Sequence, residues 1–308
     1  LSKQFQSLLS SIIELNIEDS EGAAAFLESA EHSRTGLVSS DFETRVSKIS
    51  DEHGKDPKIL AKLSRIREKQ GRMDEALELA SDAIANGPPD SEVLLRRAEL
   101  RFRENDLTGA AKDTRRILSL SGESDILVSR AVELFRRLEP TKIEELVGAP
   151  ALKALKPSYK SGIASDFGRN VSELKAAEWL LKIALDECGD ELADRIVNQL
   201  ACVLIGLQKF DEAMELVRES DQPAECFNYA VATWGKTRSV PKSLFQRMLE
   251  STKRSDLGLA TANNQFCLAL AHWAVDEIDL AKEHLDRAKQ LSMSRFAKDL
   301  SPWRYRLV

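Results

Sequence analysis

Six basic side chains form the pattern in this sequence that best suits binding chemistry. Four of them follow one another at offsets of four, three and four residues, which places them on one face of a helix, and two occupy comparable places in the next segment. The set is Lys58, Lys62, Arg65, Lys69, Arg96 and Arg103. Like charges on one face repel one another, and a bound acidic partner would relieve that repulsion. The alternative is a solvated face whose charge is balanced by Glu68, Glu92 and Glu99.

A second set, in the C-terminal half, combines amides with aromatic rings. It comprises Asn198, Asn263, Phe266 and Trp273. Amides can pair with the backbone of an extended peptide while rings anchor its side chains, so this set suits peptide binding. The competing interpretation is that Phe266 and Trp273 belong to the ordinary core of a helical hairpin.

The sequence holds no catalytic or metal-binding motif. Gly235-Lys236-Thr237 matches the end of a phosphate-binding loop, but the first glycine of that loop would fall at Ala230, in a segment of helical pattern. The histidines lack metal-ligand spacing; they are His32, His53, His272 and His284. No nucleophile motif built on serine or cysteine occurs. We therefore expect no enzyme activity, no cofactor and no metal.

Composition narrows the classes of partner. The chain has 308 residues, a net charge of −6 and 31% charged residues, which is typical of a helical soluble protein and argues against nucleic-acid binding. The apolar runs are too short to cross a bilayer, so we expect no membrane insertion. Four cysteines without a C-x-x-C pair predict reduced thiols and a cytoplasmic location. A first residue of Leu1 rather than Met indicates a processed protein or a piece of a longer one.

A spacing of about 34 residues organises most of the chain. Seven predicted helix-packing positions follow it, and five of them are alanine: Ala76, Ala110, Glu144, Ala177, Ala213, Arg247 and Ala281. A period of this length is typical of stacked helix–turn–helix units, in which small side chains let two helices approach closely. The clearest unit spans residues 57–90, with a turn at Gly71 between its two helical patterns.

These units resemble the tetratricopeptide repeat (TPR) family. The resemblance is carried by Gln70-Gly71-Arg72-Met73-Asp74-Glu75-Ala76 with Ala83 and Pro88, and by Lys209-Phe210-Asp211-Glu212-Ala213. Looser matches cover residues 91–124 and 262–295. The resemblance implies an all-α, right-handed superhelical solenoid of about eight repeats, whose first helices line a concave groove. Where some family members clamp a partner's C-terminal carboxylates, this chain has Ala61 and Arg65, so that specificity is not expected.

The organisation expected from these patterns has five parts. They are an N-terminal helix (1–22), N-terminal repeats (23–138), an irregular connection rich in Pro and Gly (139–170), C-terminal repeats (171–295) and a capping tail (296–308). The connection is either a hinge between two stacks or a decayed repeat with irregular loops.

The leading functional hypothesis is a non-catalytic scaffold that binds a protein or peptide, acidic where it meets the N-terminal half. A second is the sensory or regulatory arm of a larger enzyme or nucleotide-driven switch. A helical-repeat RNA binder is disfavoured by the acidic balance, and a helical-repeat enzyme by the lack of converging acids and histidines.

Overall fold

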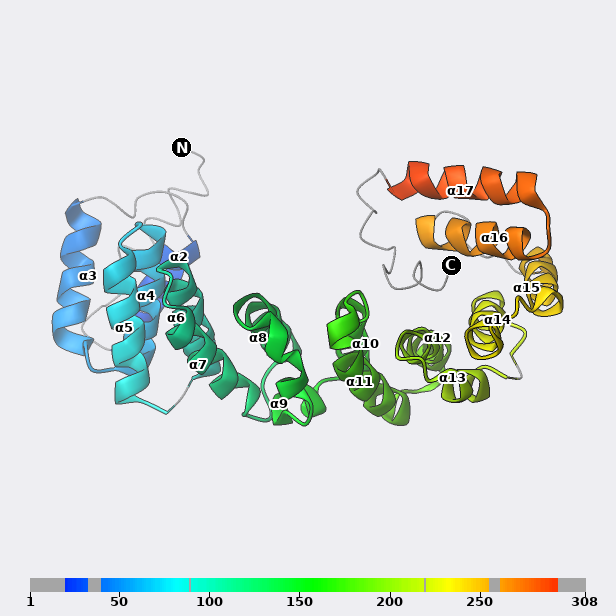
Figure 1. The fold of residues 1–308 in the computed structure, drawn as a ribbon. Coiled ribbons are helices and arrows are strands. Elements are labelled where there is room, and N and C mark those ends of the chain that lie inside the picture. Colours follow the sequence, from blue (N-terminus) through cyan, green and yellow to red (C-terminus); the bar gives the residue numbers. More distant parts are fainter. Residues whose placement is uncertain (1–19, 33–39, 89, 219, 255–260, 293–308) are drawn as a thin grey trace. The chain divides into compact units, whose positions relative to one another are not determined.

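The computed structural model describes residues 20–32, 40–88, 90–218, 220–254 and 261–292, and every regular element within them is a helix (Figure 1). The chain divides into two compact units, residues 1–140 and 141–308, which are described separately below. None of the described helices combines the length and the apolar character needed to cross a membrane. The predicted all-α solenoid fold, a TPR-like stack of helical hairpins, is confirmed within these units.

The first unit contains seven described helices. They are α2 (Ser20–His32), α3 (Ser40–His53), α4 (Pro57–Lys69), α5 (Met73–Asn86), α6 (Ser91–Arg103), α7 (Leu107–Leu118) and α8 (Asp125–Leu138). Two hairpins, α4/α5 and α6/α7, form its centre, with α2 packed on α4 and α8 packed on both α6 and α7. We call α2, α4, α6 and α8 the first helices of this unit.

The second unit continues the pattern after a short irregular stretch. It contains η1 (Pro140–Leu146), α9 (Pro150–Ala154), α10 (Pro157–Phe167), η2 (Val171–Glu173), α11 (Leu174–Glu187), α12 (Asp190–Gly206), α13 (Phe210–Leu216), α14 (Pro223–Thr237), α15 (Lys242–Arg254), α16 (Ala262–Ala274) and α17 (Ile278–Ser292). Its hairpins are α10/α11, α12/α13, α14/α15 and α16/α17. Pro140, Pro150 and Pro157 each begin a short helix, where the missing N–H of proline costs nothing.

The turns inside the hairpins share one backbone device. A residue with positive φ stands between the two helices of five hairpins: Gly71 (+79°), Asn105 (+64°), Gln208 (+61°), Arg238 (+58°) and Asp276 (+65°). This left-handed conformation ends the first helix, and glycine adopts it without steric cost. In four of these hairpins a buried alanine follows five residues later, at Ala76, Ala110, Ala213 and Ala281. In these four hairpins the alanine of the helix–helix contact therefore stands at a fixed distance from the turn.

Two of the seven predicted packing positions are wrong. Glu144 and Arg247 have side chains that are 52% and 45% exposed, whereas all five alanines are buried. Buried residues stand close to both positions: Ile143 in η1, and Phe245 and Met248 in α15. Loops of unequal length stretch the spacing to 36 residues between Ala177 and Ala213, and shorten it to 32 before Phe245. A fixed period of about 34 residues therefore predicts an exposed residue near the buried one.

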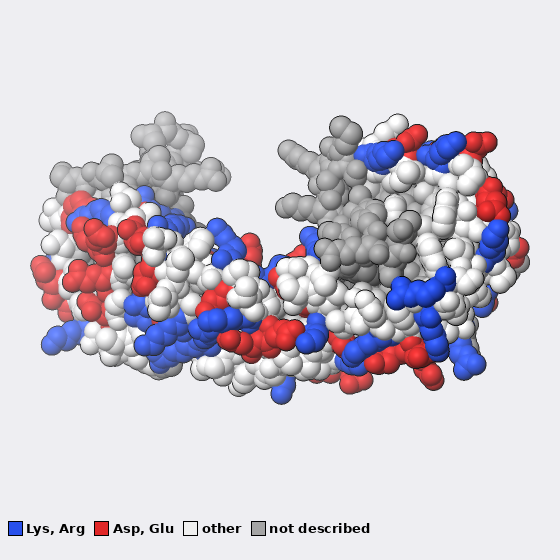
Figure 2. Space-filling view, viewed as in Figure 1, with Lys and Arg blue, Asp and Glu red and all other residues white. Residues whose placement is uncertain are grey.

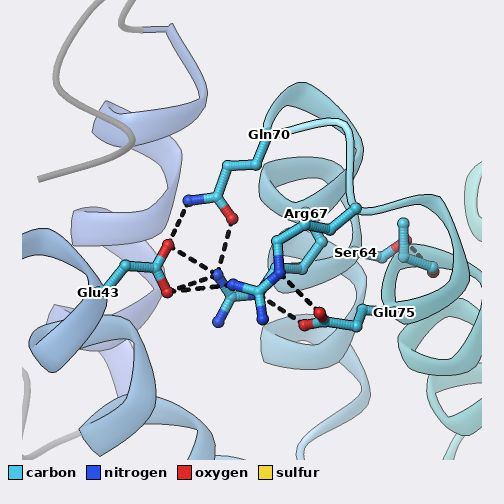
Figure 3. A network of polar contacts seen from close by, with 7 residues as sticks. Glu43, Ser64, Arg67, Gln70 and Glu75 are labelled. Atoms are coloured by element: carbon cyan, nitrogen blue, oxygen red, sulfur yellow. Dashed lines mark hydrogen bonds and ion pairs between the residues drawn. The ribbon is translucent and has the colours of Figure 1, made fainter. Parts of the chain in front are cut away.

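A polar network fastens the start of the first unit (Figure 3). The Arg67 guanidinium of α4 bonds to the Glu43 carboxylate of α3 at 2.8 Å, and the Gln70 amide donates to the same carboxylate at 2.6 Å. Burial alone would raise the pKa of Glu43, but these hydrogen bonds and the charges of Arg67 and Arg72 outweigh it and lower that pKa. The network ties α3 to the α4/α5 turn.

Three further predictions concern parts of the chain away from the hairpins. None of the four cysteines, which are predicted to be reduced, forms a disulfide bond. Residues 1–19 of the predicted N-terminal helix, and the whole predicted capping tail (296–308), lie outside the described residues.

Candidate partner-binding groove on the first helices

A groove of about 290 Å³ lies along three first helices of the first unit, α4, α6 and α8. Charged and aliphatic side chains and one serine line it: Arg65, Glu92, Leu95, Arg96, Glu99, Ser124, Ile126, Leu127 and Arg130. Side chains from three successive first helices meet here. The groove therefore offers guanidinium groups, carboxylates and apolar surface within one concave site.

Ion pairs cross this face from one first helix to the next. Five basic side chains contact a carboxylate of a neighbouring helix: Lys62–Glu28 (2.9 Å), Arg65–Glu92 (2.7 Å), Arg96–Glu68 (2.7 Å), Arg103–Glu68 (2.5 Å) and Arg130–Glu99 (2.5 Å). Figure 2 shows acidic and basic side chains side by side over this unit. The acidic residues that the alternative interpretation names as counter-charges are thus the ion-pair partners of the basic face.

The apolar part of the groove comes from Leu95 of α6 and from the start of α8. Ser124 caps this helix, its hydroxyl accepting a hydrogen bond from the Leu127 N–H at 3.3 Å. Leu127 turns inward and is buried, while Ile126 points outward and is 64% exposed. Ile126 thus gives the groove an exposed aliphatic side chain among its charged ones.

The structure brings only some of the predicted basic residues together. Arg65 and Arg96 both line the groove, and Lys62 and Arg103 pair with carboxylates beside it. Lys58 and Lys69 lie at opposite ends of α4, are exposed, and do not line it. The six predicted basic residues therefore divide into two that line the groove, two that pair with carboxylates beside it and two exposed lysines away from it.

The predicted residues of the second unit lie on two separate helices, α12 and α16, each of which is the first helix of its hairpin. Asn198 of α12 accepts a hydrogen bond from the Asn228 amide of α14. Asn263, Phe266 and Trp273 all lie on α16, where Trp273 is 43% exposed and stacks on Trp234 of α14 with ring centroids 5.8 Å apart. The structure thus shows an aromatic pair at one place and an amide pair at another.

The sequence reasoning missed Arg130 and Ile126. Arg130 stands 34 residues after Arg96 and 68 after Lys62, so the repeat period itself could have found it. The repeat period does not identify Ile126, because an isoleucine in the first turn of a helix is expected to be buried in the core.

Histidines stack at the end of the second unit. The rings of His272 (α16) and His284 (α17) are parallel within 4°, with centroids 5.1 Å apart. Burial, and then the charge of His272, lower the pKa of His284. Among the described residues, no group of three or more His, Cys, Asp or Glu side chains is arranged to hold a metal ion.

Comparisons with known proteins report similarity of fold only. No model of a protein family and no curated protein matches the chain. Similar solved structures include the C-terminal part of a TPR repeat-containing protein from Cytophaga hutchinsonii, with 10% identity over 89% of this chain and 96% of that one (TM-score 0.37). The others are the APC/C hetero-tetramer Cut9–Hcn1 (11%; 92% of this chain and 52% of that one; 0.34) and a tetratricopeptide repeat protein from Parabacteroides merdae (13%; 96% and 96%; 0.32).

Proposed function

We propose that this chain is a non-catalytic scaffold that binds a protein or peptide partner in the groove formed by α4, α6 and α8. The observation that carries the proposal is the exposed Ile126 beside Arg65, Arg96 and Arg130 in one concave site. Aliphatic and arginine side chains together suit a polypeptide, which presents both apolar and polar groups along its length.

The framework around the groove favours a rigid site. The Arg97 guanidinium bonds to both carboxylate oxygens of the buried Asp113, at 2.8 and 2.7 Å, and Arg101 adds a third bond at 2.8 Å. These bonds fasten α6, the central helix of the groove, to α7. A site held by packed helices keeps its shape on binding, which lowers the entropy cost of association.

Selection from a phage-displayed library of random dodecapeptides on the immobilised full chain tests the proposal. Peptides that are enriched reproducibly would then be measured by fluorescence anisotropy against the wild type and Ile126→Asp. The substitution places a charge on the exposed apolar contact, so we expect binding at least about tenfold weaker.

The matched control is Val171→Asp, which adds the same charge at a 45% exposed valine of the second unit and should leave affinity unchanged. Circular dichroism would verify that both variants keep the helical content of the wild type. A library that yields no enriched peptide, or affinity that is equal for the wild type and Ile126→Asp, would contradict the proposed function.

A further inference from the structure

We infer that the groove recognises a partner segment in which an acidic residue and an aliphatic residue stand two positions apart, and that Glu99 competes with the partner's carboxylate for Arg130. This inference rests on the proposed function and specifies its partner.

The first step concerns the groups that the arginines of the groove already bind. Arg65 and Arg130 each bind a carboxylate of a neighbouring helix, at 2.7 and 2.5 Å. Glu99, on α6, contacts Arg130 through one oxygen and lies 3.9 Å from the Arg96 guanidinium through the other. The groove is thus shaped so that a carboxylate fits between guanidinium groups.

The second step is the accessibility of Arg130. Its side chain is 54% exposed, and a guanidinium carries five N–H donors in a fixed fork. One oxygen of Glu99 engages only part of that fork. A carboxylate arriving from solvent can therefore bind Arg130 in a bidentate manner, and this contact is stronger and more directional than a single one.

The third step is the spacing between the two contacts. Ile126 and Arg130 are four residues apart on α8, so their side chains are neighbours on one face, about 5–6 Å apart at Cβ. In an extended peptide, side chains two positions apart point the same way and lie about 6.6 Å apart. An aliphatic side chain on Ile126 thus places the residue two positions away over Arg130.

The fourth step is the role of Glu99. A partner's carboxylate on Arg130 would lie close to the Glu99 carboxylate that the same guanidinium already binds, and the two like charges repel, so each weakens the binding of the other. Replacing Glu99 by glutamine keeps an acceptor oxygen but removes the negative charge that opposes an acidic partner. Affinity for an acidic segment therefore rises, and the chain's own residue limits how tightly the groove binds.

The test uses the enriched dodecapeptides and the full chain. We expect their alignment to show Leu, Ile or Val two positions from Asp or Glu. We expect binding about tenfold weaker with Arg130→Gln and about threefold tighter with Glu99→Gln, while Arg130→Lys, which keeps the charge but loses the fork, falls between Arg130→Gln and the wild type. The control is Glu133→Gln, which removes an exposed carboxylate of α8 outside the groove lining and should change nothing.

The outcomes separate the two proposals. A library without any enriched peptide overturns the proposed function together with this inference. Enriched peptides that lack the aliphatic–acidic pair, or that bind Arg130→Gln as tightly as the wild type, overturn the inference alone. Weaker or unchanged binding by Glu99→Gln overturns the competing role of Glu99.

Discussion

The Ser64 hydroxyl of α4 donates a hydrogen bond of 2.7 Å to the Ala76 carbonyl oxygen of α5, and both residues are buried. A side-chain bond to the backbone of the facing helix requires the two helices to lie very close together. Ala76 allows that approach because its side chain is a single methyl group.

Enlarging this contact should destabilise the hairpin. We expect Ala76→Leu, and likewise Ala213→Leu in the second unit, to lower the free energy of unfolding by about 1–3 kcal/mol, because neither helix can move away without losing other contacts. Urea denaturation followed by circular dichroism measures this. Ala85→Leu adds the same volume at an exposed position of α5 and should stay within about 0.5 kcal/mol of the wild type. Equal effects at positions 76 and 85 would contradict the assigned packing.

A substitution in one of the hairpin turns should stabilise the chain. Gln208 adopts φ +61°, a conformation in which its Cβ is strained, so Gln208→Gly should stabilise the chain by about 0.5–1 kcal/mol. Gly71 has φ +79° with open space around it, so Gly71→Ala should cost about 1 kcal/mol from backbone strain alone. Urea midpoints of the two variants check both values, and shifts of the same sign would contradict the shared role of these turns.

Regular spacing made much of the fold predictable from sequence. Ala76, Ala110 and Ala213 are small residues in a stack where small size has a packing reason, so the period identifies them. Glu144 and Arg247 fell at the same nominal spacing, but a period carries no information on where a loop gains or loses a residue. The burial of Ile143 and Met248 shows that hydrophobicity next to the expected position was the better guide.

The groove was predictable only in part. Helical spacing placed Arg65 and Arg96 on the first helices, and both do line the groove. Which carboxylate each guanidinium binds depends on rotamers and on the angle between helices, and neither follows from spacing. Ile126 could not be recognised either, because its exposure results from the cap at Ser124 and the rotation of α8 about its axis.

The buried ion cluster between α6 and α7 should be costly to break. Asp113 is almost fully buried and accepts bonds from both Arg97 and Arg101. Asp113→Ala leaves two guanidinium groups without their carboxylate in a partly buried place, and we expect a loss of about 2–4 kcal/mol in the free energy of unfolding. Asp82→Ala, which removes an exposed carboxylate of α5, is the control and should be nearly neutral in the same denaturation series. A cost below about 1 kcal/mol for Asp113→Ala would contradict the structural role of the cluster.

Stability of the last hairpin should depend on pH through His284. Burial and the nearby His272 lower its pKa in the folded state from the ordinary value of 6.5, so the unfolded chain binds the proton more readily. The stability contributed by neutral His284 is therefore full above pH 6.5 and is lost progressively as the pH falls below that value. His284→Gln should flatten the dependence of the urea midpoint between pH 7.5 and pH 5.5. An identical slope for the variant and the wild type would show that His284 does not carry it.

The most direct measurement of the central claim is methyl NMR of the full chain, labelled at its isoleucine methyl groups, during titration with an enriched peptide. A partner in the groove of α4, α6 and α8 should shift the Ile126 methyl resonance most strongly and leave that of Ile205, in α12 of the second unit, in place. If the Ile205 resonance moves while that of Ile126 stays fixed, the groove is not the binding site.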